Sequence, residues 1–241
     1  MRNYKEEFEG RVEFIRQLVK SSGVKGIVYG NSGCKDCALV SILCKAACEN
    51  TLGLILPCGS KRNYEQDLQD AQAVADKFNI ENRIVDLTPV LEAELKELEK
   101  VTELNNDARI NIAPRLRMTT LYAVAASEGR LVAGTGNRSE RHMGYFTKWG
   151  DGGCDFNPIS DLTATEVFQF LEYLEAPRCV IDKAPSAGLY EGQTDEEDMG
   201  VTYKAIDDYL LTGQASCLDR SIIDRYHQRS EHKRNPIVTY K

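Results

Sequence analysis

The sequence has few of the features that mark secreted, membrane or nucleic-acid-binding proteins. Its eight cysteines in 241 residues are about 3%, well below the density of a disulfide-stapled secreted scaffold. It has no run of about 18 apolar residues that could span a membrane, and no apolar core of a secretory signal near Met1. Its 30 Lys and Arg are outnumbered by 37 Asp and Glu, so no broad basic face for duplex nucleic acid is expected. We therefore expect a cytoplasmic protein with reduced thiols, and neither a membrane nor a nucleic acid as its partner.

What is present is the composition of a folded domain. Apolar residues make up 42% of the chain and charged residues 28%, which is enough for a sizeable core. The length fits one large α/β domain, and neither an internal repeat nor a low-complexity tract interrupts it. We expect a single domain over residues 1–241.

Strands and helices alternate through the first part of the chain. The apolar patterns predict strands at 26–29, 52–56, 83–87 and 130–134, and helices at 4–20, 38–47, 64–78 and 117–126. Such alternation predicts an α/β fold with a doubly wound parallel sheet flanked by helices. Later the alternation weakens. Helices at 164–173, 203–211 and 216–229, with a polar loop across 183–200, predict a helical C-terminal elaboration.

A glycine-rich loop follows the first predicted strand. It runs from Gly30 to Gly33 and continues as Cys34-Lys-Asp-Cys37 into a helix. In an open α/β sheet this position faces the ligand crevice, where backbone N–H groups and the helix dipole favour an anion. Asp36 beside bound phosphates would be tolerable chiefly as a ligand of Mg²⁺. From these residues alone, a structural turn with a helix-capping Asp is an equal alternative.

The same loop admits two further interpretations. Cys34 and Cys37 form a C-x-x-C at a helix N-terminus, a setting that favours a redox-active pair. Zinc could be bound by these two together with Cys44 and Cys48. The later cysteines share the helix face that the core needs, so buried structural thiols are favoured over zinc.

Three motifs in the second half of the chain resemble those of NAD synthetases. They are GTGNRSERHMGYFTKWGDGGCDFNPI from Gly134, KAPSAGLYEGQTDEEDMG from Lys183, and EHKR from Glu231. Together with the glycine loop, the resemblance extends from residue 30 to residue 234. It implies a member of the PP-loop ATP pyrophosphatase superfamily with an adenine nucleotide alpha hydrolase-like, Rossmann-like fold. It also implies an ammonia-dependent enzyme with no fused glutaminase domain.

The resemblance implies a two-step amidation. ATP is cleaved between its α and β phosphates, the nicotinate carboxylate of deamido-NAD becomes an acyl adenylate, and ammonia attacks it to give NAD, AMP and pyrophosphate. Carboxylates are poor electrophiles, so adenylation supplies a leaving group, and the enzyme contributes positioning and charge neutralisation. The resemblance further implies ATP as co-substrate, Mg²⁺ as cofactor and a homodimer. The apolar helices around 121–126 and 171–174 are candidate interface material.

The same resemblance assigns roles to three groups of residues. Asp36 and Glu140 resemble the catalytic carboxylates that hold Mg²⁺. The ATP contacts would be Gly30, Asn31, Ser32, Gly33, Cys34, Lys35, Asp36, Cys37, Thr135 and Ser186. Deamido-NAD would be held by Arg115, Lys148, Asp155, His232 and Lys233. Cations suit its pyrophosphate and carboxylate, whereas outside the motifs the same residues would be ordinary surface charges.

Three positions depart from the family pattern. Cys34 stands where the second loop glycine is usual, Cys37 where a serine hydroxyl faces phosphate, and Ala164 where an ATP-contacting Lys is common. A Cys at a glycine position restricts the backbone, and a thiol is a weaker donor than a hydroxyl. These departures leave open a catalytically weakened nucleotide-binding or redox-sensing relic of the same fold. Lys35 could partly compensate for the missing lysine.

Overall fold

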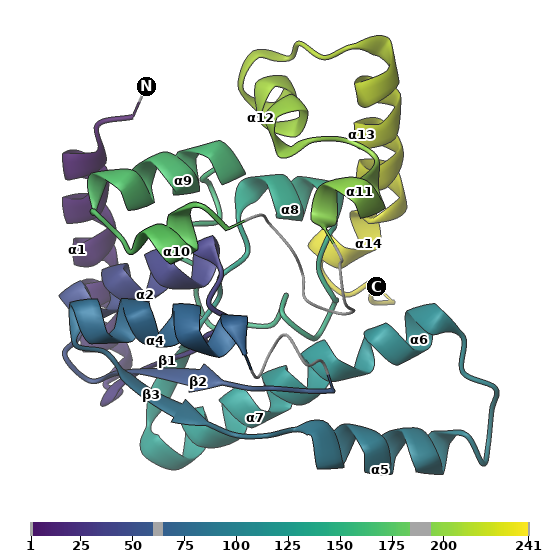
Figure 1. The fold of residues 1–241 in the computed structure, drawn as a ribbon, viewed down its shortest axis with the longest axis horizontal. Helices are drawn as coiled ribbons and strands as arrows, with labels where there is room; N and C mark the ends of the chain where they lie inside the picture. Colours follow the sequence, from purple (N-terminus) through teal and green to yellow (C-terminus); the bar gives the residue numbers. More distant parts are fainter. Residues whose placement is uncertain (1, 60–64, 184–193, 241) are drawn as a thin grey trace.

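The computed structural model describes residues 2–59, 65–183 and 194–240. Within them, four parallel strands form one sheet in the order β3-β2-β1-β4 (Figure 1). The strands are β1 (Gly26–Gly30), β2 (Thr51–Ile55), β3 (Glu81–Ile84) and β4 (Arg130–Ala133). The register places Ile27 opposite Thr51 on one side and Leu131 on the other. The predicted parallel α/β sheet is confirmed.

The central strand β1 is buried on both faces of the sheet. Ile27 and Tyr29 join a core cluster with α1 (Tyr4–Ser22), α2 (Lys35–Ala47), α4 (Gln66–Phe78) and α9 (Ala164–Tyr173). Val28, between them in sequence, packs in a second cluster with α7 (Ile112–Glu128). Successive strand side chains point to opposite faces, so one short apolar segment holds helices on both sides of the sheet (Figure 1).

Two helices that flank the sheet begin earlier than the apolar pattern predicted. Helix α2 begins at Lys35, because Cys34 is its N-cap and the Cys34 thiol accepts a hydrogen bond from the backbone N–H of Cys37. Helix α7 begins at Ile112, ahead of Pro114. A proline in the first turn is tolerated, since its missing N–H would have no partner inside the helix.

The edge of the sheet differs from the prediction. The third strand was predicted at 83–87, but β3 occupies Glu81–Ile84, where it pairs with Leu52 through Ile55 of β2. The chain then forms α5 (Thr88–Leu98), which was not predicted. None of the residues of α5 is buried, but Leu91, Leu95 and Leu98 recur at helical spacing, so the sequence carried a helical signal here that our interpretation missed.

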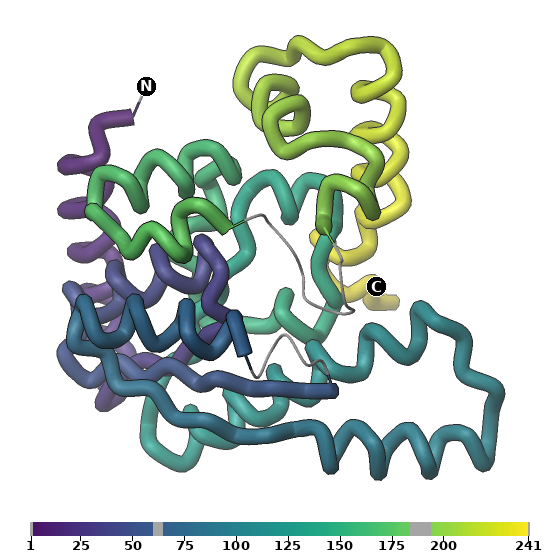
Figure 2. Tube along the Cα trace, viewed as in Figure 1, coloured from purple at the N-terminus to yellow at the C-terminus, as the bar shows by residue number. Residues whose placement is uncertain are grey.

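The C-terminal part of the chain is helical. Helices α12 (Tyr203–Thr212) and α13 (Cys217–Arg229) pack with α8 (Arg138–Met143) around a small cluster centred on Met143 and Ile206. Figure 2 shows these helices and α14 (Glu231–Arg234) at the side of the molecule remote from α1. The shorter helices α6 (Asn106–Ile110) and α10 (Arg178–Ile181) complete the described elements apart from α11. No helix among the described ranges is long and apolar enough to cross a membrane.

The prediction of an unbroken polar loop across 183–200 was wrong. Residues Asp195–Met199 form helix α11. Its N-cap is Thr194, whose hydroxyl accepts a hydrogen bond from the backbone N–H of Glu197, and Gly200 ends it in the left-handed conformation. A polar segment with a good cap at each end can form a helix without a long apolar face.

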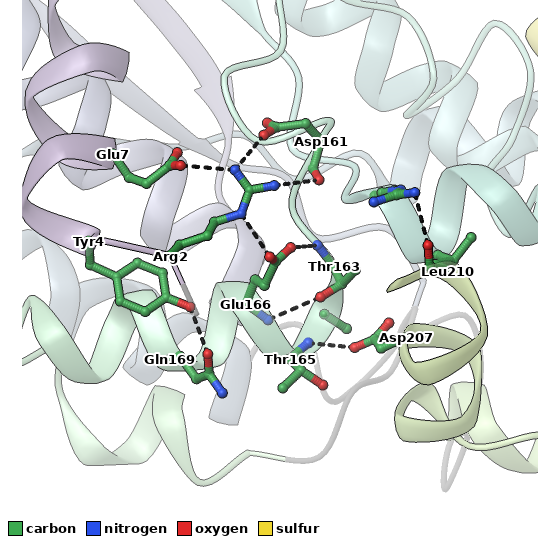
Figure 3. Close-up of polar contacts among 12 residues, drawn as sticks. Arg2, Tyr4, Glu7, Asp161, Thr163, Thr165, Glu166, Gln169, Asp207 and Leu210 are labelled. Atoms are coloured by element: carbon green, nitrogen blue, oxygen red, sulfur yellow. Dashed lines mark hydrogen bonds and ion pairs between the residues drawn. The ribbon is translucent and has the colours of Figure 1, made fainter. Parts of the chain in front are cut away.

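Figure 3 shows how separate parts of the chain anchor the first turn of α9. Thr163 and Glu166 form a capping box at its N-terminus. The Glu166 carboxylate also accepts a hydrogen bond from the Arg2 guanidinium at 2.7 Å. On the other side, the backbone N–H of Thr165 donates to the Asp207 carboxylate of α12 at 2.7 Å. These contacts fix the position of the first turn of α9.

Candidate active site

The carboxyl ends of β1 and β4 open into a cavity of about 900 Å³. Its wall is formed by the glycine loop, α7, α8, residues 144–153, the start of α9, Tyr203 and residues 229–233. Most of the residues predicted to bind ATP or substrate line it. They are Gly30, Asn31, Ser32, Cys34, Lys35, Asp36, Cys37, Thr135, Glu140, His232 and Lys233. The structure thus brings together residues more than 200 positions apart in the sequence.

Gly33 lies beneath the loop rather than on the cavity wall. Its φ is +66°, and a Cβ atom there would come within 2.4 Å of the backbone oxygen of Asp67 in α4. A side chain at this position would therefore clash and strain the backbone. Cys34, at the position where the family has its second glycine, has a φ of −86°. The expected backbone restriction at Cys34 is therefore absent, because this conformation is open to any residue.

The thiols of Cys34 and Cys37 lie side by side at the N-terminus of α2. Their Sγ atoms are 3.1 Å apart, and the Cys37 thiol is 3.2 Å from the hydroxyl of Ser32. Hydrogen bonds from Cys34 and Ser32 lower the pKa of Cys37 to about 6, against the effect of burial. The shared hydrogen bond and burial raise the pKa of Cys34. The Cys37 thiol therefore loses its proton first, and the Cys34 thiol keeps its proton and donates it to the Cys37 sulfur.

The two predicted catalytic carboxylates meet at the cavity wall. Asp36 is in the first turn of α2, and Glu140 is in the first turn of α8. Burial raises the pKa of Asp36 to about 7. Burial and the negative charge of Asp36 raise the pKa of Glu140. Two neighbouring carboxylates with raised pKa values form a site that a cation would stabilise.

Asn137 holds both carboxylates in place, and the sequence interpretation did not single it out. Its side-chain amide donates to Asp36 Oδ1 at 3.0 Å. Its side-chain oxygen accepts from the backbone N–H of Glu140, and its own backbone N–H donates to Glu140 Oε2, both at 2.9 Å. The signal was available, because an Asn three residues before a Glu is the pattern of a capping box.

Four of the five residues predicted to hold deamido-NAD form one neighbourhood. The Lys148 ammonium donates to the backbone oxygen of His232 at 2.6 Å, and Arg115 donates to the backbone oxygen of Lys148 at 3.3 Å. Lys233 donates to the backbone oxygens of Gly144 and Phe146 at 2.7 and 2.6 Å. These contacts bind the C-terminal helix α14 to the segment that carries Lys148. Arg115 and Lys148 stand outside the cavity wall that His232 and Lys233 help to form.

The fifth residue, Asp155, lies apart from this group. Its carboxylate accepts hydrogen bonds from the Tyr122 hydroxyl at 3.1 Å and from the backbone N–H of Val132 at 2.8 Å. Asp155 is exposed beside β4 and α7, and it does not line the cavity. Ser186, which was predicted to contact ATP, lies outside the described residues.

A buried ion cluster behind the loop was also missed. Lys183 lies 2.8 Å from the carboxylate of Asp67 and 2.7 Å from that of Asp70, both on α4. The Lys183 ammonium also donates to the backbone oxygen of Gly33 at 3.3 Å, and its own backbone oxygen accepts from Lys35. Lys183 opens the second family motif, which was its only signal in the sequence. Its partners are more than 100 residues away.

Comparison with known proteins identifies the family. The family model described as NAD synthase matches residues 7–237. The chain belongs to the NAD synthase family. A relative from Carboxydothermus hydrogenoformans, described as an NH(3)-dependent NAD(+) synthetase, is 46% identical over 235 residues, which cover 96% of each sequence. The predicted family and its class of enzyme, an amide-forming ligase, are therefore confirmed.

Solved structures of the family share the fold. The NMN synthetase from Francisella tularensis has a TM-score of 0.93 at 39% identity, with 100% of this chain and 99% of that chain covered. The NH3-dependent NAD synthetase from Campylobacter jejuni has a TM-score of 0.82 at 29% identity, with 100% of both chains covered. The predicted Rossmann-like architecture of NAD synthases is thus confirmed over the whole chain.

Proposed function

We propose that this NAD synthase family member catalyses the ATP-dependent amidation of deamido-NAD with ammonia, through an acyl adenylate, to give NAD, AMP and pyrophosphate. One observation carries the proposal. One cavity is lined by the glycine loop, by the paired carboxylates Asp36 and Glu140, and by His232 and Lys233. Phosphate, metal and dinucleotide chemistry can therefore meet in one enclosed volume. The catalytic unit would be a single domain over residues 1–241.

The carboxylate pair fits Mg²⁺ as a cofactor. No group of three or more His, Cys, Asp or Glu side chains suited to a metal occurs among the described residues, so protein ligands alone do not complete a cage. Mg²⁺ commonly takes one or two carboxylates and completes its shell with water and substrate phosphates. Asp36 and Glu140 would hold the ion. Burial raises the pKa of both carboxyl groups, and a bound cation would stabilise their ionised forms. When bound, Mg²⁺ supplies charge neutralisation for the triphosphate.

The loop residues would position the leaving pyrophosphate. The segment from Gly30 to Cys37 with Thr135 lies at the carboxyl edge of the sheet, and the N-terminus of α2 favours negative charge there. Ser32 exposes a hydroxyl in the cavity. Ser186 is a further proposed ATP contact. The adenylation step then depends on alignment of the substrate carboxylate with the α phosphate, which is a positioning task.

The proposed deamido-NAD site lies around His232 and Lys233, with Arg115, Lys148 and Asp155 further out. Since these outer three stand off the cavity wall of one chain, we propose a homodimer in which the dinucleotide extends from the cavity toward the subunit interface. The partly exposed helix α7 around 121–126 is the interface candidate. The 171–174 segment is a poorer one, because Leu171 is fully buried in the core of its own chain.

The reaction is tested by pyrophosphate release from ATP plus deamido-NAD, with and without ammonium. We expect product only when both substrates and Mg²⁺ are present, and NAD only when ammonium is added. Nicotinate mononucleotide is the second acceptor to assay, because one solved relative is described as an NMN synthetase. Pyrophosphate release that does not depend on either acceptor would contradict the proposal. ATP binding with no pyrophosphate release would instead favour the catalytically weakened nucleotide-binding relic.

The carboxylate roles are tested by Asp36→Asn with Asp208→Asn as the matched control. Asp208 is an exposed carboxylate of α12 that is paired with Lys204 and is not among the residues that line the cavity. We expect at least a hundredfold loss of NAD formation in Asp36→Asn, which is about 2.7 kcal/mol of transition-state stabilisation. Asp208→Asn should retain the parent rate. Glutamine should not replace ammonium for the purified chain.

A further inference from the structure

We propose that Cys34 and Cys37 are a reversible dithiol–disulfide site inside the ATP loop, oxidised by low-molecular-weight disulfides and antagonised by bound ATP. The pair itself stands on geometry alone. Its effect on ATP rests on the function proposed above. The two cysteines stand where the family pattern described above has a glycine and a serine.

The sulfur atoms are already placed for bond formation. Their separation is 3.1 Å, and a disulfide needs about 2.05 Å, so closure requires each sulfur to move by only about half an ångström. The backbone N–H of Cys37 donates to Cys34 Sγ at 3.3 Å, which holds the Cys34 side chain toward Cys37. Neither residue has a positive φ; Cys34 is the N-cap of the 13-residue helix α2, and Cys37 lies in its first turn. The dithiol is thus held in the arrangement that closure demands.

The other six cysteines differ from this pair in access or in company. Cys44 and Cys58 are buried in the core clusters, and Cys48 and Cys154 are half-buried against them. Cys179 and Cys217 are exposed on separate helices. Cys34 is half-buried and Cys37 is buried, yet both line the 900 Å³ cavity. A small disulfide can enter a cavity of that size, whereas a protein oxidant cannot. The expected oxidant is therefore a small molecule, and glutathione disulfide is the probe.

The chemistry balances in two exchange steps. One sulfur of the pair attacks the small disulfide as its thiolate and forms a mixed disulfide, while its proton leaves with one small thiol. The second sulfur of the pair then attacks the protein sulfur of that mixed disulfide, and its proton leaves with the second small thiol. The two protons and two electrons of the protein dithiol end on two molecules of reduced small thiol. Reduction by an excess of that thiol runs the same steps backwards.

Disulfide formation alters the surface that ATP would contact. It removes both S–H groups from the loop, and it draws the Cys37 sulfur away from its present position 3.2 Å from Ser32 Oγ. Cys37 stands at the position where a hydroxyl of the family faces phosphate, so the loop loses one donor to the nucleotide. The loss of one neutral hydrogen bond corresponds to roughly three- to tenfold weaker ATP binding. By thermodynamic reciprocity, saturating ATP must favour the dithiol by the same factor.

The test uses the full chain equilibrated in glutathione buffers of graded oxidation, followed by acid quenching and peptide mass spectrometry. We expect a loss of two hydrogens that links Cys34 to Cys37, reversed by dithiothreitol. Calorimetry with a non-hydrolysable ATP analogue should give roughly three- to tenfold weaker binding to the oxidised protein. With the analogue present, the glutathione ratio for half oxidation should rise by that same factor. Cys34→Ser and Cys37→Ser should abolish the linked peptide and the response of ATP binding to the buffer. Cys217→Ser, an exposed cysteine outside the cavity, should retain both.

Two results would overturn the proposal. One is a mixed glutathione adduct at Cys34 or at the exposed cysteines without the Cys34–Cys37 link. The other is a linked protein that binds the analogue as tightly as the reduced one. If either result is found and the reduced protein still makes NAD, the dithiol proposal is wrong and the proposed function stands. Reduced protein that makes no NAD removes the proposed function, and the peptide map still decides the dithiol.

Discussion

Replacement of Asn137 should separate the stability of helix α8 from the positioning of the catalytic carboxylates. In Asn137→Ala, α8 loses its N-cap, which costs about 1 kcal/mol, and Asp36 loses a hydrogen-bond donor, which costs about 1.5–2 kcal/mol for a charged acceptor. We expect a loss of about 2–3 kcal/mol of folding free energy, and a fall in Tm of roughly 4–10 °C. Because Asp36 is no longer held, the KM for ATP with Mg²⁺ should rise at least about fivefold.

Two further variants assign the effect to one contact or the other. Asn105 is also an N-cap asparagine, and it accepts from the backbone N–H of Ala108 at 2.8 Å, but it caps α6, which carries neither Asp36 nor Glu140. Asn105→Ala should therefore lower Tm slightly and leave the KM unchanged. Asn137→Ser keeps a capping oxygen but is too short to reach Asp36, so only the share of the cap, about 1 kcal/mol, should return while the KM stays high. Thermal unfolding and steady-state kinetics give both readouts. A KM for ATP in Asn137→Ser equal to that of the parent would refute the positioning role.

Three other substitutions test parts of the molecule around the cavity. Lys183→Met leaves the Asp70 carboxylate buried without its cation, and should cost about 3–5 kcal/mol in a urea unfolding curve; a further Asp70→Asn change should recover part of that loss. Lys35→Ala should raise the KM for ATP severalfold, because Lys35 lines the cavity beside the loop; an unchanged KM would show that its charge has no part in ATP binding. Arg11→Met breaks a two-point contact with Asp161, at 2.6 and 2.8 Å, and should cost about 1 kcal/mol at neutral pH. Arg11 lowers the pKa of Asp161 in the folded protein, so the contact stabilises the fold at pH values above the ordinary carboxyl pKa. This stabilisation is lost as the pH falls through the lowered pKa of the folded state, so the stabilities of parent and variant should converge in acid.

Local patterns in the sequence predicted the parts of the fold that local physics controls. The apolar run at 26–29 and the glycines after it predicted β1 and its loop, because a strand buried on both faces needs a continuous apolar segment. Helix α9 was predicted with the same bounds that the structure gives, and Thr163 caps it. Helix α5 was missed although Leu91, Leu95 and Leu98 recur at helical spacing and Pro89 stands in its first turn, so its signal was local and was overlooked.

Site residues that belong to sequence motifs were predictable, whereas contacts between distant segments of the chain were not. The loop and the carboxylates Asp36 and Glu140 came from motifs, and both lie on the cavity wall. The contact of Lys183 with Asp67 and Asp70 joins segments more than 100 residues apart, and no spacing rule reveals such a pair. Asp155 was assigned to the substrate group by its motif, but the fold places it beside Tyr122, outside the cavity wall.

Gly33 packs so closely against α4 that position 33 has no room for a side chain, whereas the neighbouring position 34 already carries one. Position 33 has a backbone oxygen 2.4 Å from where a Cβ would stand, whereas position 34 has an ordinary φ of −86° and lines the cavity. A saturation library should therefore tolerate many residues at 34 and almost none at 33. Position 34 is also an attachment point for a small thiol-reactive fluorophore, whose emission would report occupancy of the cavity without any change to the scaffold beneath it.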